Sequence, residues 1–445
     1  MRQVHGKGAA SHLIRNGIAL FMTASLCLSG CSRKESDRES SAQPTPTPPL
    51  PRRNYDTGRL YSGLALKSSV ECTSGTQTTL ETIAETNSYQ VDISLHVRWP
   101  AAATNTAQLA TATPELPPIL PDLDQLLDGI SPSPDYAQLL SNKEKSLRSH
   151  LASLQKLPYR DSLFDCQTIL NLRNQPSGRR ALLVQAIMNV NTDGSDGDRN
   201  IAIDRTSSTF QPQTNYRWAK SGHRTNPCLR DAEVRLALAE AELANGTNSP
   251  EVRQRLESEC TSAKATIAEL KHWSFLVGTA DPFIVLPSFM VGKSTGQLAI
   301  GDFAVVIAHG ILYPAVLGDL GPGSKIGEAS LRICREVDAK SEAERRPDSR
   351  PDIVYLVFPG SADKPLTAPD YKHWSERCHA LWKEFGGSDS TPWHEWTSLE
   401  LPWPTPTPSQ TPSATPTHAD PPNGTNSASI PSNSTSILSS PPTNR

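Results

Sequence analysis

A glycine-punctuated stretch at residues 301–330 most constrains the fold of this 445-residue chain. Two short apolar runs flank His309-Gly310, a pattern that predicts a hairpin turn. The second run ends at Gly318-Asp319, a Gly/Pro-rich loop follows, and Ile326-Gly327-Glu328 opens a helical pattern. We therefore predict a hairpin, a loop and a helix, with glycines that let the backbones approach closely.

This arrangement makes Asp319 and Glu328 candidate partners. Held at a strand end and a helix start, they could face each other across a small gap. Two carboxylates so placed can protonate a glycosidic oxygen and activate water or attack the sugar. The alternative is a surface Asp in a turn and a Glu that the helix dipole favours in a first turn, and spacing alone favours that alternative.

Several blocks of the chain together resemble the fungal-type chitosanases, glycoside hydrolase family 75. The blocks are 188–194, 281–287, 305–310, 318–319, 326–330 and 352–359. The resemblance implies that Asp319 and Glu328 are the catalytic carboxylates of an inverting enzyme that needs no cofactor. It also implies a small, mostly β barrel of the double-psi kind. Inversion predicts a carboxyl separation of about 6.5–9.5 Å, against about 5–5.5 Å for retention.

The resulting hypothesis is an endo-acting glycoside hydrolase that cleaves β-1,4 linkages of an amino-sugar polysaccharide, by resemblance chitosan. Which carboxylate is the acid stays open: a helix N-terminus would lower the pKa of Glu328, and burial would raise it. The alternatives are a glycanase acting on peptidoglycan and a non-catalytic surface lipoprotein that binds polysaccharide. A formal net charge of −3 argues against a nucleic-acid partner, and we expect a monomer.

Substrate contacts are expected outside the carboxylate pair. The segment 191–199 holds three acids, but it lacks a Glu at EF-hand spacing, so Asx turns are favoured over calcium binding. A carboxylate there would pair with the ammonium group of glucosamine, and aromatic rings at a cleft rim would stack on sugar faces. The candidate substrate-binding residues are Asp193, Asp198, Tyr216, Trp218, His309 and Tyr313.

Residues 1–31 have the features of an export signal. Basic residues precede a short apolar run that ends Leu28-Ser29-Gly30-Cys31, which is similar to a bacterial lipobox. We therefore expect Cys31 to carry lipid and residues 32–60, rich in Pro and Thr, to form a tether. The protein would be exported and lipid-anchored at the cell envelope, at the outer membrane in one variant of this hypothesis. The alternative is an ordinary cleaved signal and a secreted protein.

Six of the 8 cysteines would remain outside the signal and the lipid site. An even number in an exported protein allows three disulfides, and one pairing is Cys72–Cys166, Cys228–Cys260 and Cys334–Cys378. Free buried thiols are the alternative. The spacings include no Cys-x-x-Cys pair of the kind typical of zinc sites, so no metal is predicted.

The predicted fold class is α+β. Residues 61–175 would be an accessory α+β domain, or packing that buttresses the barrel, with a strand near 89–99. Helices are expected at 123–130, 136–157 and 166–172.

Residues 176–400 would form the catalytic domain. Two helices within 229–272 would form an inserted hairpin, and a terminal helix would lie within 366–385. Residues 401–445 are rich in Pro, Ser and Thr, and we predict that they are disordered.

Overall fold

The computed structural model describes residues 64–69, 92–129, 131–153, 163–246, 248–292 and 297–403. These ranges all belong to one compact unit, Asp56–Arg445. The expected signal, the tether, the tail beyond residue 403, Cys31 and Cys72 lie outside the described residues. No helix among the described residues is both long enough and apolar enough to cross a membrane.

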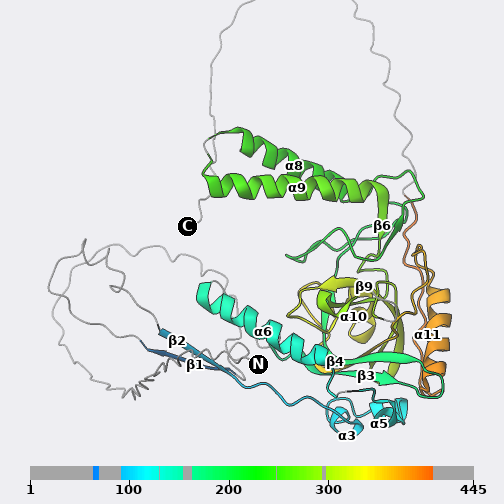
Figure 1. Ribbon diagram of the computed structural model, residues 1–445. Coiled ribbons are helices and arrows are strands. Elements are labelled where there is room, and N and C mark those ends of the chain that lie inside the picture. The colour runs from blue at the N-terminus through cyan, green and yellow to red at the C-terminus, as the bar shows by residue number, and fades with distance from the viewer. Residues whose placement is uncertain are drawn as a thin grey trace, which may run out of the picture. The chain divides into compact units, whose positions relative to one another are not determined.

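The centre of the fold is a closed barrel of six strands (Figure 1). Its strands, in the order of their pairing, are β10 (Glu328–Ser330), β7 (Phe283–Pro287), β9 (Ile311–Gly321), β8 (Phe303–Ala308), β11 (Asp348–Val357) and β4 (Arg180–Asn191). The pairing of β10 with β4 closes the ring. β7–β9 and β10–β4 are parallel and the other pairs are antiparallel. The mixed α+β class and the barrel are therefore confirmed.

The predicted hairpin at His309-Gly310 is confirmed as the connection between β8 and β9. Ala308 pairs with Ile311, so the turn has two residues. Both turn residues have positive φ, 51° at His309 and 76° at Gly310, as a two-residue turn matching the strand twist requires. This turn fixes the register along β9.

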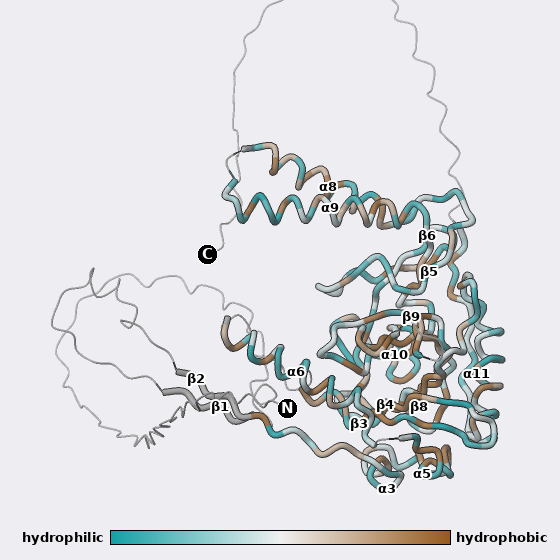
Figure 2. The backbone as a smooth tube through the Cα atoms, in the orientation of Figure 1, coloured by the Kyte–Doolittle hydropathy of each residue, from teal (hydrophilic) through white to brown (hydrophobic). Residues whose placement is uncertain are grey.

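Side chains along the barrel strands alternate between two hydrophobic clusters. On β8, Phe303 and Val305 belong to the first cluster, while Ala304 and Val306 belong to the second. The first cluster also contains Trp382 and other side chains of α11 (Tyr371–Phe385), the expected terminal helix. The second includes residues of α10 (Leu331–Val337). Figure 2 shows the hydrophobic residues concentrated in the barrel.

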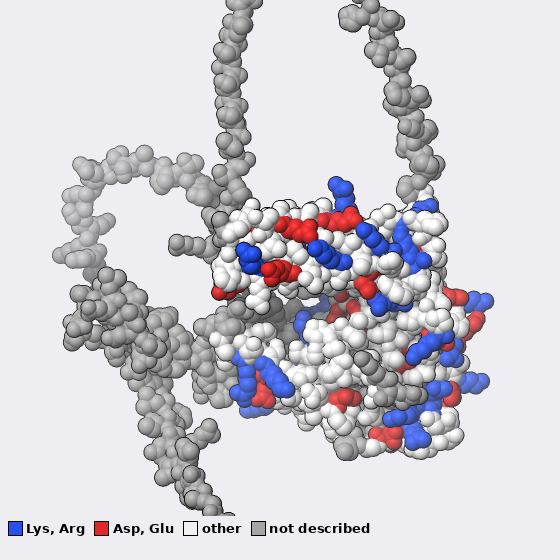
Figure 3. Space-filling view, turned by 45° about the horizontal axis from the view of Figure 1, so that its top comes forward, with Lys and Arg blue, Asp and Glu red and all other residues white. Residues whose placement is uncertain are grey.

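The inserted helical hairpin is confirmed as α8 (Leu229–Ala244) and α9 (Pro250–His272). Ser249 caps α9 by accepting a hydrogen bond from the Val252 amide, with Pro250 at the first helical position. The insertion leaves and rejoins the domain through two paired strands, β5 (Arg217–Ala219) and β6 (Trp273–Phe275). Acidic and basic side chains intermingle over the face of the molecule in Figure 3, and ion pairs such as Lys264–Glu240 link the two helices.

The chain before the barrel contributes a short antiparallel pair of strands and several helices. They are β1 (Leu64–Ser69), β2 (Asp92–Val97), α3 (Thr106–Leu109), α4 (Leu116–Ile119), α5 (Leu123–Leu126) and α6 (Pro134–Ser153). Leu109, Leu116 and Leu123 pack in the first hydrophobic cluster with barrel residues. Tyr136 and Leu139 of α6 pack in the second.

The prediction of a helix at 166–172 is wrong. This segment is the strand β3 (Cys166–Arg173), which pairs antiparallel with β4 as a seventh strand. Its consecutive residues Ile169 and Leu170 point to opposite faces and are both buried, because one face lies on each hydrophobic cluster. A short apolar run buried on both faces carries no period that separates strand from helix.

The disulfide prediction is wrong for the cysteines that the structure describes. Cys166, Cys228, Cys260, Cys334 and Cys378 are free, buried thiols. In the helical hairpin, Cys228 packs with Leu270 near the base and Cys260 packs with Ala239 farther along, in separate clusters. Cys334 and Cys378 belong to the two different barrel clusters. Each thiol therefore serves as a small apolar side chain.

Candidate active site

The two predicted carboxylates lie at the same level of three neighbouring strands. Val285 of β7 pairs with Asp319 of β9 on one side and with Glu328 of β10 on the other. Residues paired across adjacent strands share a face of the sheet. With strands spaced about 4.7–4.9 Å apart, the two backbones are separated by about 9–10 Å.

A bulge at Gly318 makes this alignment possible. Leu317 pairs with Ile284 and Asp319 pairs with Val285, so one residue of β9 is skipped. Such a bulge reverses the side on which the following residues point. A Cβ atom at position 318 would lie 2.6 Å from the Phe283 Cβ, so only glycine fits. The Gly-Asp dipeptide therefore turns Asp319 toward the face that carries Glu328.

Asn215 holds the end of β9 by two hydrogen bonds. Its backbone amide donates to Asp319 Oδ1 (2.9 Å), and its side-chain Oδ1 accepts from the Leu320 amide (3.0 Å). The next residue, Tyr216, donates its amide hydrogen to the Gly318 carbonyl (2.7 Å). The loop before β5 thus fixes the carboxylate of Asp319.

Asn191 links Glu328 to a third carboxylate, Asp193. The Asn191 side-chain Nδ2 lies 2.9 Å from Glu328 Oε1 and 3.1 Å from Asp193 Oδ2. Asp193 also accepts a hydrogen bond from the Gln211 amide (2.6 Å). The structure therefore brings Asp193, Asp319 and Glu328 into one cluster, with Asn191 between two of its members.

Burial raises the pKa of all three carboxyl groups. For Asp319, which is 7 % exposed, burial raises the pKa to about 7, opposed by the amides of Asn215 and Leu320 and reinforced by Asp193 and Glu328. For Asp193, burial raises the pKa to about 6. Burial also raises the pKa of Glu328, while the Asn191 hydrogen bond and the charge of Lys325 oppose the shift.

Glu328 does not begin a helix, contrary to prediction. It begins β10, and the helix α10 starts three residues later with Ser330 as its cap, accepting a hydrogen bond from the Ile333 amide. The expectation that a helix dipole would lower the pKa of Glu328 is therefore wrong. Burial governs the pKa of this group and raises it.

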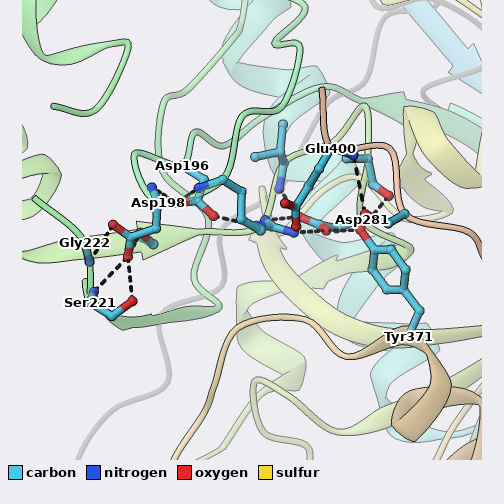
Figure 4. Close-up of polar contacts among 12 residues, drawn as sticks. Asp196, Asp198, Ser221, Gly222, Asp281, Tyr371 and Glu400 are labelled. Carbon is cyan, nitrogen blue, oxygen red and sulfur yellow. Dashed lines mark hydrogen bonds and ion pairs between the residues drawn. The ribbon is translucent and has the colours of Figure 1, made fainter. Parts of the chain in front are cut away.

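Asp198 lies apart from the carboxylate cluster. Its Oδ2 accepts a hydrogen bond from the Ser221 amide (2.8 Å) and its Oδ1 accepts one from the Gly222 amide (2.9 Å), as Figure 4 shows. These contacts hold the turn at Ser221-Gly222. Of the two acids expected to bind substrate, only Asp193 is placed beside Asp319 and Glu328.

The predicted aromatic contacts are buried rather than exposed at a rim. Tyr216 is 4 % exposed and Trp218 is 6 % exposed, and their rings meet edge to face at 6.2 Å. The Tyr216 hydroxyl donates to the Thr367 carbonyl (3.1 Å). These rings therefore support the loop that holds Asp319 and present little surface to a ligand.

The two hairpin residues proposed to bind substrate lie at the other end of β9 from Asp319. His309 is exposed in the turn, ten residues before Asp319. Tyr313 is buried and stacks on His394, with 5.2 Å between ring centroids. Tyr313 lies six residues before Asp319 and His309 lies ten residues before it. At about 3.3 Å per residue along a strand, each is about 20 Å or more from Asp319.

A buried ion-pair bracket, defined as Arg199, Asp196, Asp281 and Tyr371, closes the loop that carries Asp193. Arg199 binds Asp196 through Nε (2.6 Å) and Asp281 through both terminal nitrogens (2.8 Å each). The Tyr371 hydroxyl donates to Asp281 (2.6 Å). Figure 4 shows these groups converging from loops before β5 and β7 and from α11.

Within the described ranges, no group of three or more His, Cys, Asp or Glu side chains could hold a metal ion. The carboxylate cluster is the arrangement that stands out chemically: two acids with raised pKa on rigid strands, about two strand spacings apart. Such a pair can supply the acid and the base that hydrolysis of a glycosidic bond requires.

Comparison with protein families agrees with this chemistry. Residues 188–385 match the family described as fungal chitosanase of glycosyl hydrolase group 75, and this part of the chain is a domain of that family. The chain therefore carries a glycoside hydrolase domain of the chitosanase type. No curated protein sequence matched the chain.

The structure adds two functional candidates that reasoning from sequence missed, Asn191 and Asn215. Asn191 could have been suspected, because it lies two residues before Asp193 at the end of a predicted strand. Asn215 has no such signal, since its role depends on a contact with a residue 104 positions away.

Proposed function

We propose that this protein is an endo-acting chitosanase in which Asp319 is the general acid and Glu328 the general base of an inverting reaction. The observation that carries the assignment is the placement of both carboxylates at one level on β9 and β10, with β7 between them. The two backbones lie about 9–10 Å apart, a spacing from which the side chains can leave the gap of about 6.5–9.5 Å between carboxyl groups that admits a water molecule.

The division of roles follows from the surroundings of each acid. Asp319 is the more deeply buried, and its pKa of about 7 keeps it protonated in weakly acidic solution, as a proton donor requires. Glu328 is more exposed and receives a hydrogen bond from Asn191. Burial and the neighbouring Asp193 raise the pKa of Glu328, while that bond and the charge of Lys325 oppose the rise and favour the ionised form that a base requires.

A substrate rich in ammonium groups fits the charge of the cluster. Asp193 contributes a third carboxylate beside the reacting pair, and an ammonium group of glucosamine can pair with it. Asp193 therefore is our candidate for binding the amino group of the sugar. We also infer that the barrel is of the double-psi kind, an arrangement that its two parallel and four antiparallel pairings support.

The function is tested by release of reducing ends from soluble chitosan, chitin and peptidoglycan. Release from chitosan at mid-chain positions, with products of inverted anomeric configuration seen by proton NMR, is the expected result. Release from peptidoglycan alone would assign the enzyme to a cell-envelope glycan. Binding to a polysaccharide without cleavage would contradict an enzymatic function.

Replacing Asn191 with Ala is expected to narrow the pH profile. The loss of its hydrogen bond raises the pKa of Glu328, so the acidic limb of kcat/KM moves to higher pH, while the alkaline limb near the pKa of Asp319 stays in place. We expect kcat to fall about tenfold. Asn171→Ala is the matched control, because the Asn171 side chain binds Ser133 instead. An unchanged acidic limb would contradict the role of Asn191.

We also propose that the protein is exported and anchored through a lipid on Cys31. The support is the sequence of the segment around Cys31 alone. Cys31→Ala is expected to move the protein from the membrane fraction to the soluble fraction of a bacterial host. Intact-mass analysis should show the loss of a diacylglyceryl-type modification. Equal distribution of both proteins would favour the ordinary cleaved signal.

A further inference from the structure

The loop 322–327 joins the two proposed catalytic residues, because it connects the end of β9 to the start of β10. Ile326 is buried in the second hydrophobic cluster. Gly327 has a positive φ of 76°, and a Cβ atom there would lie 2.3 Å from the Ile187 carbonyl oxygen. The loop is short, so its conformation sets where Glu328 lies relative to Asp319.

Side chains from α6 and from the residue before β3 bind the backbone of this loop. Lys143 Nζ donates to Asp165 Oδ2 (2.8 Å) and to the Ser324 carbonyl (2.7 Å). Asp165 Oδ2 also accepts a hydrogen bond from the Ile326 amide (3.2 Å). The Lys143 side chain is 1 % exposed and that of Asp165 is 0 % exposed.

A neighbouring contact on α6 reaches the same loop. Asn142 Nδ2 donates to the Gly323 carbonyl (3.1 Å). Three of the six loop residues are therefore held through their backbone by the side chains of Asn142, Lys143 and Asp165. Figure 1 shows one end of α6 lying beside β3 and β4, and Tyr136 and Leu139 of this helix pack in the second hydrophobic cluster.

A buried ion pair is a poor device for stability alone, because removing two charges from water costs as much as their attraction returns. Burial raises the pKa of Asp165 to about 6 even beside Lys143. The geometric effect of the pair is more specific: it binds a carbonyl and an amide of one loop at the same time. All three side chains lie before residue 188, where the match to the chitosanase family begins.

The loop also carries Lys325, whose charge acts on Glu328. Lys325 lies between the two residues that the ion pair holds, Ser324 and Ile326. Its charge opposes the effect of burial on the Glu328 pKa. Holding the loop therefore holds both the backbone that leads to Glu328 and the cation near it.

We propose that Lys143 and Asp165 are positioning residues, a buried clamp from outside the family domain that fixes the loop 322–327 and thereby the placement of Glu328 and Lys325 relative to Asp319. The clamp gives the chain before the barrel a part in catalysis. This inference rests on the proposed function for its kinetic test.

The test uses the full chain with three variants. Lys143→Met combined with Asp165→Leu replaces the pair with apolar side chains, so that no single charge is left buried. Asn142→Ala removes the contact with Gly323, together with the hydrogen bond that Asn142 accepts from Gln138. Arg148→Met is the matched control, since Arg148 is an exposed cation of α6 that pairs with Glu144. The measurements are kcat and KM on soluble chitosan from pH 4 to pH 8, and hydrogen exchange of the backbone amides at 323–328.

In the double variant we expect kcat to fall about tenfold or more, because small displacements of reacting groups are costly, with KM changed less than about twofold. The acidic limb of the pH profile should move to higher pH as Lys325 leaves Glu328, and the loop amides should exchange faster. Asn142→Ala should show the same changes to a smaller extent, and Arg148→Met should show none.

The proposed positioning role would be overturned if the double variant had the kcat, the pH profile and the loop hydrogen exchange of the wild type. If the double variant does not fold, Lys143→Met alone takes its place, because it removes the bond to the Ser324 carbonyl and leaves Asp165 able to neutralise by protonation. The same three wild-type values in Lys143→Met would then overturn the positioning role. Failure of the proposed function is distinguishable: a wild-type protein that releases no reducing ends from chitosan refutes the activity, and the exchange of the loop amides still decides the clamp.

Discussion

Asp319→Asn and Glu328→Gln are each expected to lower kcat on soluble chitosan by about 10²–10⁴-fold. The reason is that each variant removes one of two proton transfers while keeping the shape of the side chain. Both positions are supported by hydrogen bonds that the amide variants can retain in part, from the Asn215 amide and from the Asn191 side chain. Reducing-end release at several pH values measures the effect.

A substrate with a good leaving group separates the two roles. An aryl glycoside of a glucosamine oligomer needs little protonation on departure, so Asp319→Asn should lose far less activity on it than on chitosan. Glu328→Gln should lose the same factor on both, because water must still be activated. Glu384→Gln is the control, since Glu384 forms a surface ion pair with Arg179. The reverse pattern would exchange the assigned roles, and wild-type activity of both variants would refute the site.

The stability of Asp319→Asn provides an independent check that the fold is intact. Burial raises the pKa of Asp319 from 3.8 to about 7. Between these values the unfolded chain has lost the proton that the folded chain keeps, so the free energy of unfolding falls as pH rises from about 4 to about 7. Asp319→Asn lacks this pH-dependent contribution. Its free energy of unfolding should equal that of the wild type in acid and exceed that of the wild type above pH 7.

Arg199→Leu is expected to lower the free energy of unfolding by about 3–5 kcal/mol, because it leaves buried carboxylates without their partner. Asp196 and Asp281 have side chains that are 0 % exposed, and Arg199 supplies ion pairs to both. Urea unfolding at pH 7, followed by far-UV circular dichroism, measures the loss. The same change should also disturb the loop that carries Asp193.

Two further variants define the bracket. Tyr371→Phe removes one hydrogen bond to Asp281 and should cost about 1–3 kcal/mol. Arg205→Leu removes an exposed pair with Asp231 and should cost less than about 1 kcal/mol. If Arg199→Leu lowers the free energy of unfolding by less than Arg205→Leu does, the bracket does not stabilise the fold.

The local sequence pattern was sufficient to predict those elements whose conformation depends mainly on their own residues. The hairpin at His309-Gly310, the paired helices of the insertion and the strand that ends at Asn191 follow from apolar periodicity and turn residues. The pairing of Asp319 with Glu328 was inferred from glycine placement and family resemblance. The register of β7 with both neighbours supports it.

Partners distant in sequence decided the rest. β3 is a strand because β4 offers it a free edge, and Glu328 begins a strand because β4 and β7 lie on either side of it. Two predicted pairs, Cys228–Cys260 and Cys334–Cys378, do not form because the packing of the helices and the barrel places the two members of each pair in separate clusters.

The sequence by itself predicted the hairpin, the inserted helices and, through family resemblance, a barrel. It also singled out Asp319 and Glu328 as the candidate catalytic acids. Only the tertiary structure decided which groups surround those acids: Asn191, Asn215 and Asp193 beside them, and Lys143 with Asp165 behind the loop that joins them. The physical reason is that periodicity and turn chemistry act over a few residues. Burial, hydrogen bonding and charge coupling, which set the pKa of a catalytic group, depend on contacts between segments separated by a hundred residues or more.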